Sequence, residues 1–318
     1  MKQRIGEIDF LRCVLILLMV TFHIVYAGDT YPLAKRVVYT FHMPAFLVVS
    51  GFLCNTSKDR RQFFRSMLWI FIPYLVMESG YVAMAAVLPI REHIDNLTLA
   101  LMARKLFLHP IGPYWYLHTW VLCSVVCFLA MRLTRIHPGA RLAAAAAACL
   151  LLARSGILSA PNAMYFMAGA AIRQTGVPFT AAFRPAWWAA LPVIPVIIFL
   201  PSQLDRATPG GIAVVWLMTS FILYMYRLTD GRVRRAMLLV GSNTLLLLLL
   251  FSPVFTALSK LYQPFFISTD PSGIAFCAVT VTAATLGSLL IGYLSDRLHI
   301  SPLLFGKREV LNRPAGEH

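Results

Sequence analysis

The chain has 318 residues, of which 59% are hydrophobic and only 13% are charged. A soluble domain carries about 25% charged residues, so this composition excludes an ordinary soluble protein and predicts a membrane protein. The net charge of +15 is divided among short basic clusters between apolar runs, where topology signals lie. This placement argues against a nucleic-acid-binding surface and predicts no nucleic-acid partner.

Ten apolar segments follow one another along the chain and predict an all-α, polytopic transmembrane bundle of about ten helices. They cover residues 10–27, 37–54, 67–88, 113–131, 140–153, 160–173, 185–201, 212–226, 237–258 and 274–294. Several of them are shorter than the roughly 20 residues that a spanning helix needs. The fifth and sixth are the weakest, so the alternative of eight or nine spans stays open.

The distribution of basic residues predicts the orientation of these segments. With ten spans and the N-terminus inside, 20 of the 28 lysines and arginines fall on inner segments and the other 8 on outer ones. This bias follows the positive-inside rule and predicts that both termini are cytoplasmic. No linker or internal repeat interrupts the pattern, so residues 1–318 are expected to form one membrane domain.

The six cysteines all lie inside apolar stretches. They form no CxxC pair and no zinc-type spacing, which favours small buried hydrophobic residues and predicts no metal site.

The first segment carries three ionisable residues, Asp9, Arg12 and His23, where charge is costly and a function is the first hypothesis. Arg12 and His23 are eleven positions apart, so on a helix they fall within about 20° of each other and roughly 16 Å apart along the axis. Asp9 lies three residues before Arg12, within reach of its guanidinium. The alternative is a snorkelling arginine and a histidine hydrogen-bonded inside the bundle.

Three more ionisable residues are predicted in the outer half of the membrane. Glu78 lies thirteen residues after Arg65, roughly 20 Å along a helix, which resembles the depth of His23. His118 and His42 lie near the outer ends of their segments. Each is a candidate for orienting a base or binding a substrate, and each has the alternative of a local hydrogen bond.

Two further features have both a structural and a functional interpretation. Ser50-Gly51 lets helices approach closely, or it contacts a ligand. The inner cluster of Lys58, Arg60, Arg61 and Arg65 serves topology or anionic lipid, or it binds a phosphate-rich cytosolic cofactor, since arginine suits phosphate geometry.

Taken together and in order, these pieces resemble the acyltransferase-3 family. The residues that carry the resemblance are Ile8-Asp9-Phe10-Leu11-Arg12 with His23, Phe41-His42-Met43-Pro44-Ala45-Phe46 with Ser50-Gly51-Phe52, Lys58 to Arg65 with Ile72-Pro73-Tyr74, Trp115-Tyr116-Leu117, and Gly241-Ser242-Asn243. The chain is most similar to the short form without a periplasmic hydrolase-like domain, such as fucose 4-O-acetylase-like proteins. It departs from the family pattern after Asn243, where Leu245 to Leu250 and Phe251 replace a tyrosine and a histidine.

The resemblance implies a multi-pass protein of the bacterial inner membrane that transfers an acyl group, with acetyl expected, from cytosolic acyl-CoA to an extracytoplasmic carbohydrate hydroxyl. It assigns His23 as catalytic base and Arg12 to the donor-binding motif. We hypothesise that Asp9, Lys58, Arg60, Arg61 and Arg65 complete the donor site and that Glu78 or His118 assists the base. His42, Ser50, Trp115 and Tyr116 are the expected acceptor-binding residues. The expected partners are acyl-CoA (acetyl-CoA), the carbohydrate and membrane lipids.

Histidine suits this role because its ordinary pKa, near 6.5, lets it accept and release a proton at neutral pH. A covalent acyl-histidine is a variant of the same scheme. Two other functions stay open at this point. One is a proton-coupled transporter or exporter with His23, Glu78 and His118 as a relay, and the other is a catalytically silent scaffold.

Overall fold

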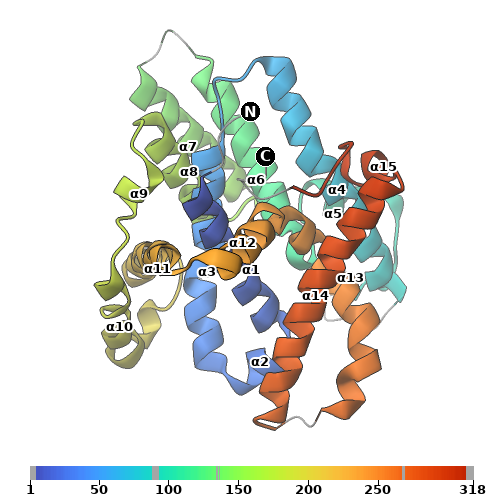
Figure 1. The fold of residues 1–318 in the computed structure, drawn as a ribbon. Coiled ribbons are helices and arrows are strands. Elements are labelled where there is room, and N and C mark those ends of the chain that lie inside the picture. The colour runs from blue at the N-terminus through green and yellow to red at the C-terminus, as the bar shows by residue number, and fades with distance from the viewer. Residues whose placement is uncertain (1–4, 88–92, 134, 136, 267–268, 313–318) are drawn as a thin grey trace. The chain divides into compact units, whose positions relative to one another are not determined.

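The computed structural model describes residues 5–87, 93–133, 135, 137–266 and 269–312. All regular elements in these ranges are helices (Figure 1). In chain order they are α1 (Gly6–His23), α2 (Val25–Thr30), α3 (Pro32–Leu53), α4 (Arg60–Val87), α5 (Leu99–Phe107), η1 (Gly112–Tyr114), α6 (Trp115–Met131), α7 (Pro138–Arg154), α8 (Ala160–Gln174), α9 (Phe179–Ala182), η2 (Trp187–Ala190), α10 (Val193–Phe199), η3 (Pro201–Gln203), α11 (Pro209–Leu228), α12 (Gly231–Ser242), α13 (Thr244–Tyr262), η4 (Gln263–Phe265), α14 (Ser272–Arg297) and α15 (Ser301–Phe305).

The chain divides into two compact units. The first unit comprises residues 1–46, 180–299 and 309–318, and the second comprises residues 47–179 and 300–308. The boundary at residues 46 and 47 falls inside α3, so this helix contributes to both units.

In the first unit, α1 packs against α11, α12, α13 and α14, and α13 also packs along α14 (Figure 1). Glycines permit the closest approaches. A Cβ on Gly241 of α12 would overlap the backbone carbonyl of Asp9, and one on Gly6 would meet the hydroxyl of Tyr226. The ring of Tyr226 also contacts Phe10, with 5.6 Å between ring centroids. These contacts bury the start of α1, where Ile8, Phe10 and Leu11 are almost inaccessible.

In the second unit, α6 packs against α4, α7 and α8, and α4 also contacts α5 and α15. The rings of Phe63 and Phe128 stack with 3.9 Å between centroids and join α4 to α6. The C-terminal half of α3 packs against α8, where a Cβ on Gly51 or Gly169 would overlap backbone atoms of the other helix. Small residues therefore set the helix spacing here, as expected for packing inside a membrane.

The prediction of an all-α, polytopic membrane bundle is confirmed. Within the described ranges, five helical stretches are long and apolar enough to cross a membrane, and α12 with α13 makes a sixth if this pair, bent by 81°, is one span. The five are Pro32–Leu53, Arg60–Val87, Leu99–Met131, Pro209–Leu228 and Ser272–Arg297. Predicted segments 140–153 and 160–173 correspond to α7 and α8, which have 17 and 15 residues.

The prediction of one unbroken helix was wrong for three segments. Segment 10–27 ends its helix at His23 and continues as α2 after a break at Ile24. Segment 185–201 consists of η2, α10 and the start of η3, because its prolines lack the amide hydrogen that a longer helix needs. Segment 237–258 breaks at Asn243.

Residue 88 of segment 67–88 lies outside the described residues, as do Lys2, Arg4, Arg91 and Arg313 of the charge distribution. The ten-span count and the cytoplasmic placement of both termini stay predictions.

Candidate functional site

Helix α1 presents Arg12 and His23 on one stripe. It runs unbroken from Gly6 to His23, so the two residues keep their helical spacing of about 20° around the axis and roughly 16 Å along it. Both side chains meet α13. Arg12 contacts Thr244 at the first residue of α13, and the ring of His23 meets that of Phe251 seven residues later. The prediction that Arg12 and His23 share a helix face is confirmed.

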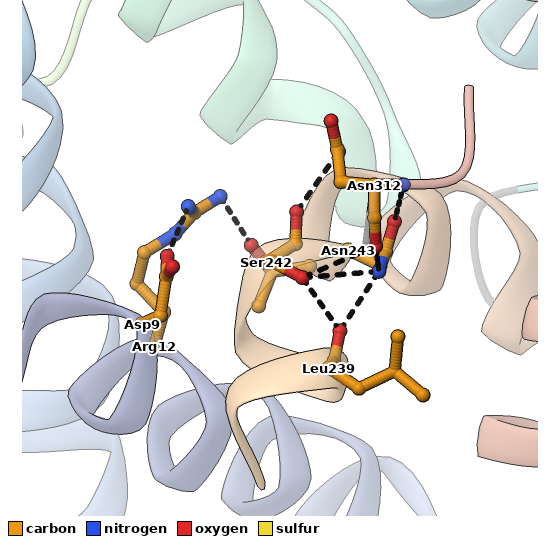
Figure 2. A network of polar contacts seen from close by, with 7 residues as sticks. Asp9, Arg12, Leu239, Ser242, Asn243 and Asn312 are labelled. Atoms are coloured by element: carbon orange, nitrogen blue, oxygen red, sulfur yellow. Dashed lines mark hydrogen bonds and ion pairs between the residues drawn. The ribbon is translucent and has the colours of Figure 1, made fainter. Parts of the chain in front are cut away.

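The Arg12 guanidinium joins two elements. Its Nη1 lies 3.4 Å from Oδ1 of Asp9 (Figure 2). Its Nη2 donates to Oγ1 of Thr244 at 2.5 Å. The Arg12 side chain keeps 18% of its surface exposed. Because Thr244 begins α13, the guanidinium stands beside the positive end of a helix dipole, which is an arrangement that favours an anionic ligand. Asp9 was predicted from the sequence and Thr244 was not, because its only signal is a polar Asn243-Thr244 pair before a run of six leucines.

His23 is the last residue of α1 and is exposed. Its Nδ1 lies 2.7 Å from the carbonyl oxygen of Met19, and because a carbonyl only accepts, Nδ1 must be the donor. A neutral ring therefore carries its lone pair on Nε2. The hydrogen bond thus selects the tautomer that leaves Nε2 as a base.

Two aromatic side chains of α3 lie beside His23. The ring of Tyr39 is 6.0 Å from that of His23 and 5.1 Å from that of His42, and its hydroxyl donates to the carbonyl of Phe22. His42 is 2% exposed, and its Nδ1 donates to the Val38 carbonyl at 2.7 Å. Its Nε2 has no hydrogen-bond partner among the described residues. Tyr39, which contacts the rings of both histidines, was not predicted from the sequence.

Glu78 and His118 belong to the second unit, where they bind the chain that joins α5 to α6. Oε1 of Glu78 accepts from the Ile111 amide at 2.7 Å, and Nε2 of His118 donates to the Phe107 carbonyl at 2.9 Å. The hydroxyl of Tyr74 donates to the carbonyl of Leu106 at 2.7 Å. These contacts favour the alternative of local hydrogen bonds for Glu78 and His118. Their assistance to a base stays a prediction.

The remaining residues expected at the acceptor lie together in the second unit. The hydroxyls of Ser50 and Tyr116 are 2.6 Å apart and buried, and the half-buried ring of Trp115 is 6.4 Å from that of Tyr116. Gly51, next to Ser50, packs against the backbone of Phe166. Helix packing therefore accounts for Gly51, while acceptor binding by Ser50, Tyr116 and Trp115 stays a prediction.

The basic cluster lies around the start of α4. Arg60, Arg61 and Arg65 are exposed, and Nζ of Lys58 donates to the hydroxyl of Ser66 at 2.7 Å. The structure adds two cations that are distant in sequence: Arg132 donates to the Lys58 carbonyl, and Nζ of Lys307 lies 5.4 Å from the centroid of the Trp69 ring, which Arg65 also covers. Exposed arginines that lie near one another suit binding to phosphate groups.

All six cysteines are buried free thiols, in agreement with their interpretation as small hydrophobic residues. The sulfurs of Cys123 and Cys149 come within 3.9 Å of each other. The described residues contain no group of three or more histidine, cysteine, aspartate or glutamate side chains placed to hold a metal ion.

A protein-family model matches most of the chain. The model of the acyltransferase-3 family, described as an acyltransferase domain, matches residues 5–293. The match includes the α1 stripe, α3, the basic cluster and the break before α13. No curated protein and no solved structure matches the chain. A match over most of the 318 residues shows that the chain belongs to the acyltransferase-3 family of membrane acyltransferases.

Proposed function

We propose that the protein transfers an acyl group, most simply acetyl, from cytosolic acyl-CoA to a hydroxyl of an extracytoplasmic or lipid-linked carbohydrate. One observation carries the proposal. In a chain of an acyltransferase family, Arg12 and His23 share the α13-facing stripe of α1, and the hydrogen bond to Met19 leaves Nε2 of His23 as a base.

The donor is bound through its phosphates. Arg12 stands at the N-terminal end of α13, where the helix dipole adds to its charge. Within the second unit, the exposed Arg60, Arg61 and Arg65 are also guanidinium groups of the kind that suits phosphate. Because CoA is highly charged and cytosolic, holding its head group at the inner surface avoids the desolvation cost of moving it into lipid.

The chemical step is a general-base-catalysed acyl transfer. Nε2 of His23 takes the proton of the carbohydrate hydroxyl as its oxygen attacks the thioester carbonyl carbon. A new C–O bond forms, the C–S bond breaks, and the proton returns from the imidazolium to the departing thiolate. The products are an ester and free CoA, so no further reactant is needed.

His42 is proposed to orient the acceptor. Its Nε2 is buried and carries the remaining lone pair of the ring, so it accepts a hydrogen bond from a substrate hydroxyl. The ring of Tyr39 contacts the rings of both His42 and His23. Glu78 and His118 contribute indirectly, by fixing the chain between α5 and α6.

The test uses the purified protein in vesicles with acetyl-CoA and a carbohydrate acceptor. Free CoA and a mass increase of one acetyl group on the acceptor are expected to appear in equal amounts. A transporter would release no CoA. Full activity in His23→Ala would refute the proposal, and His137→Ala is the matched control because His137 is exposed and only caps α7. Mass spectrometry of surface glycans from cells with and without the gene identifies the natural acceptor.

A further inference from the structure

A segment near the C-terminus is bound at the break between α12 and α13 (Figure 2). Oδ1 of Asn243 accepts from the backbone amide of Asn312 at 2.7 Å, and Nδ2 of Asn243 donates to the backbone carbonyl of Asn312 at 2.8 Å. One side-chain amide therefore satisfies both backbone groups of a residue 69 positions away. We refer to this pair, with residues 310–312, as the Asn243–Asn312 clasp.

Other contacts hold the same three residues. Nδ2 of Asn312 donates to the carbonyl of Ser242 at 3.0 Å. The carboxylate of Asp296 accepts from the amides of Val310 and Leu311 at 2.8 and 2.9 Å. Three successive residues are thus fixed by side chains that lie at the helix break and on α14.

The clasp meets a need created by the break. A bend of 81° interrupts the backbone hydrogen-bond ladder of an apolar segment, and groups freed inside a membrane protein must find other partners. Within α12, Nδ2 of Asn243 and the hydroxyl of Ser242 also donate to the carbonyl of Leu239. Asn312 adds the donor for the Ser242 carbonyl, so the bend is held from outside the two helices.

The residues on both sides of Asn243 contact the proposed donor site. Thr244, the next residue, accepts the 2.5 Å hydrogen bond from Arg12. Gly241, two residues earlier, packs against the carbonyl of Asp9, and Asp9 holds the same guanidinium. A change in the bend at Asn243 must therefore move the partners of Arg12.

We propose that Asn243 and Asn312 are positioning residues for the acyl donor: the C-terminal segment fixes the α12–α13 bend and thereby sets Thr244 against Arg12. This inference rests on the proposed donor role of Arg12. Neither asparagine takes part in the chemical step. Opening the clasp therefore weakens donor binding and leaves turnover at saturating acyl-CoA unchanged.

The test compares two truncated chains, one ending at Glu309 and one ending at Arg313. The first lacks the clasp residues and is expected to raise KM for acetyl-CoA about tenfold, the effect of losing the charged hydrogen bond from Arg12 to Thr244, with kcat retained. The second keeps Asn312 and is the matched control. Adding a synthetic peptide of residues 309–318 to the shorter chain is expected to lower KM again. If truncation had instead misfolded the protein, the peptide would not restore KM.

Point variants are expected to raise KM for acetyl-CoA by different amounts, according to how many clasp hydrogen bonds each one removes. Asn243→Ala removes both hydrogen bonds from the Asn243 side chain to the Asn312 backbone, leaves the Asn312 carbonyl with the 3.5 Å bond from the Ser242 hydroxyl, and is expected to act like the shorter chain. Asn312→Ala keeps those bonds and loses only the one to Ser242, so its effect is smaller. In an Arg12→Gln background, Asn243→Ala is expected to add nothing, because the group that it positions is gone.

The outcomes separate the two proposals. If Arg12→Gln alone leaves KM for acetyl-CoA unchanged, the donor role of Arg12 fails. If Arg12→Gln raises KM while the chain ending at Glu309 behaves as wild type, the donor role stands and the clasp proposal is overturned. Additive effects of Arg12→Gln and Asn243→Ala overturn it as well.

Discussion

Gly241 of α12 packs against the backbone carbonyl of Asp9 in α1, with no space for a side chain between the two helices. We predict that Gly241→Ala forces the helices apart and lowers the free energy of unfolding by about 1–3 kcal/mol, the usual cost of overpacking. KM for acetyl-CoA should rise as well, because Asp9 holds Arg12. Thermal unfolding in detergent and initial-rate kinetics measure the two effects.

The matched control is Gly80→Ala. Gly80 lies within α4, and a Cβ there meets nothing within 4 Å. Alanine is favoured over glycine in a helix by roughly 0.5–1 kcal/mol, so this variant should be neutral or slightly stabilised. Equal destabilisation by both substitutions would show that the Asp9 contact is not the cause.

Thr244 provides a sharper test of the donor site. We predict that Thr244→Val, which removes the oxygen that accepts from Arg12, raises KM for acetyl-CoA by about three- to tenfold through the loss of one charged hydrogen bond. The kcat should stay within twofold or so of wild type, because the contact lies at the opposite end of α1 from His23.

Thr282→Val is the control for this substitution. Thr282 is exposed on α14, and its hydroxyl donates to the carbonyl of Ala278 in its own helix. It should leave both kinetic constants unchanged. A Thr244→Val enzyme that loses kcat and keeps its KM would place Thr244 in the chemical step instead.

The parts of the site that sequence analysis predicted are those set by local geometry. The Arg12–His23 stripe and the Asp9–Arg12 pair depend only on the helical repeat within α1, which the apolar pattern makes evident. Thr244 was not predicted because it lies 232 residues from Arg12 in sequence. A run of apolar residues carries no pattern that indicates such a long-range contact. Asn312, the partner of Asn243, lies 69 residues away and likewise has no local signal in the sequence.

The errors in the fold have a related cause. Apolar length predicts that a segment is buried in the membrane, but it does not show where polar contacts interrupt a helix. Segment 237–258 breaks at Asn243 because side chains of Asn312 and Ser242 replace the lost backbone partners. Segment 185–201 breaks at prolines that are visible in the sequence. It was predicted as one helix because its apolar length was given more weight than these prolines.

Glu78 allows a catalytic carboxylate to be distinguished from a structural one. We predict that Glu78→Gln keeps activity, because its amide oxygen still accepts from Ile111, whereas Glu78→Ala leaves a buried amide unpaired and lowers the free energy of unfolding by about 1–3 kcal/mol. Hydrogen exchange of residues 106–111 should quicken in Glu78→Ala. Tyr74→Phe should act on the same segment through Leu106.

The opposite result for the glutamine variant would change this interpretation. A Glu78→Gln protein with wild-type stability and normal exchange at residues 106–111, yet without acyl transfer, would assign the carboxylate to the chemistry.

Asp270 gives the first unit a contact that depends on pH. The hydroxyls of Tyr26 and Tyr31 both donate to its carboxylate, between α2 and the start of α14. Hydrogen bonds to the charged form lower the pKa of Asp270, with Tyr26 the larger contributor. Because the pKa is depressed in the folded state, the stabilisation is present above the ordinary carboxyl pKa and is lost as the pH falls through the lowered value.

We therefore predict that hydrogen-exchange protection at Gly273 and Ala275, whose amides donate to the carbonyls of residues 269 and 271, persists below the ordinary aspartate pKa of about 3.9 in the wild type. In a Tyr26→Phe/Tyr31→Phe double variant both donors are gone and the carboxyl returns to its ordinary pKa, so this contact should add no protection at any pH and the dependence on Asp270 should disappear. Tyr293→Phe, on the exposed surface of α14, is the control and should follow the wild type. Identical pH profiles for the double variant and the wild type would mean that the tyrosines do not stabilise the charged carboxylate, and the contact would then hold α2 to α14 by packing alone.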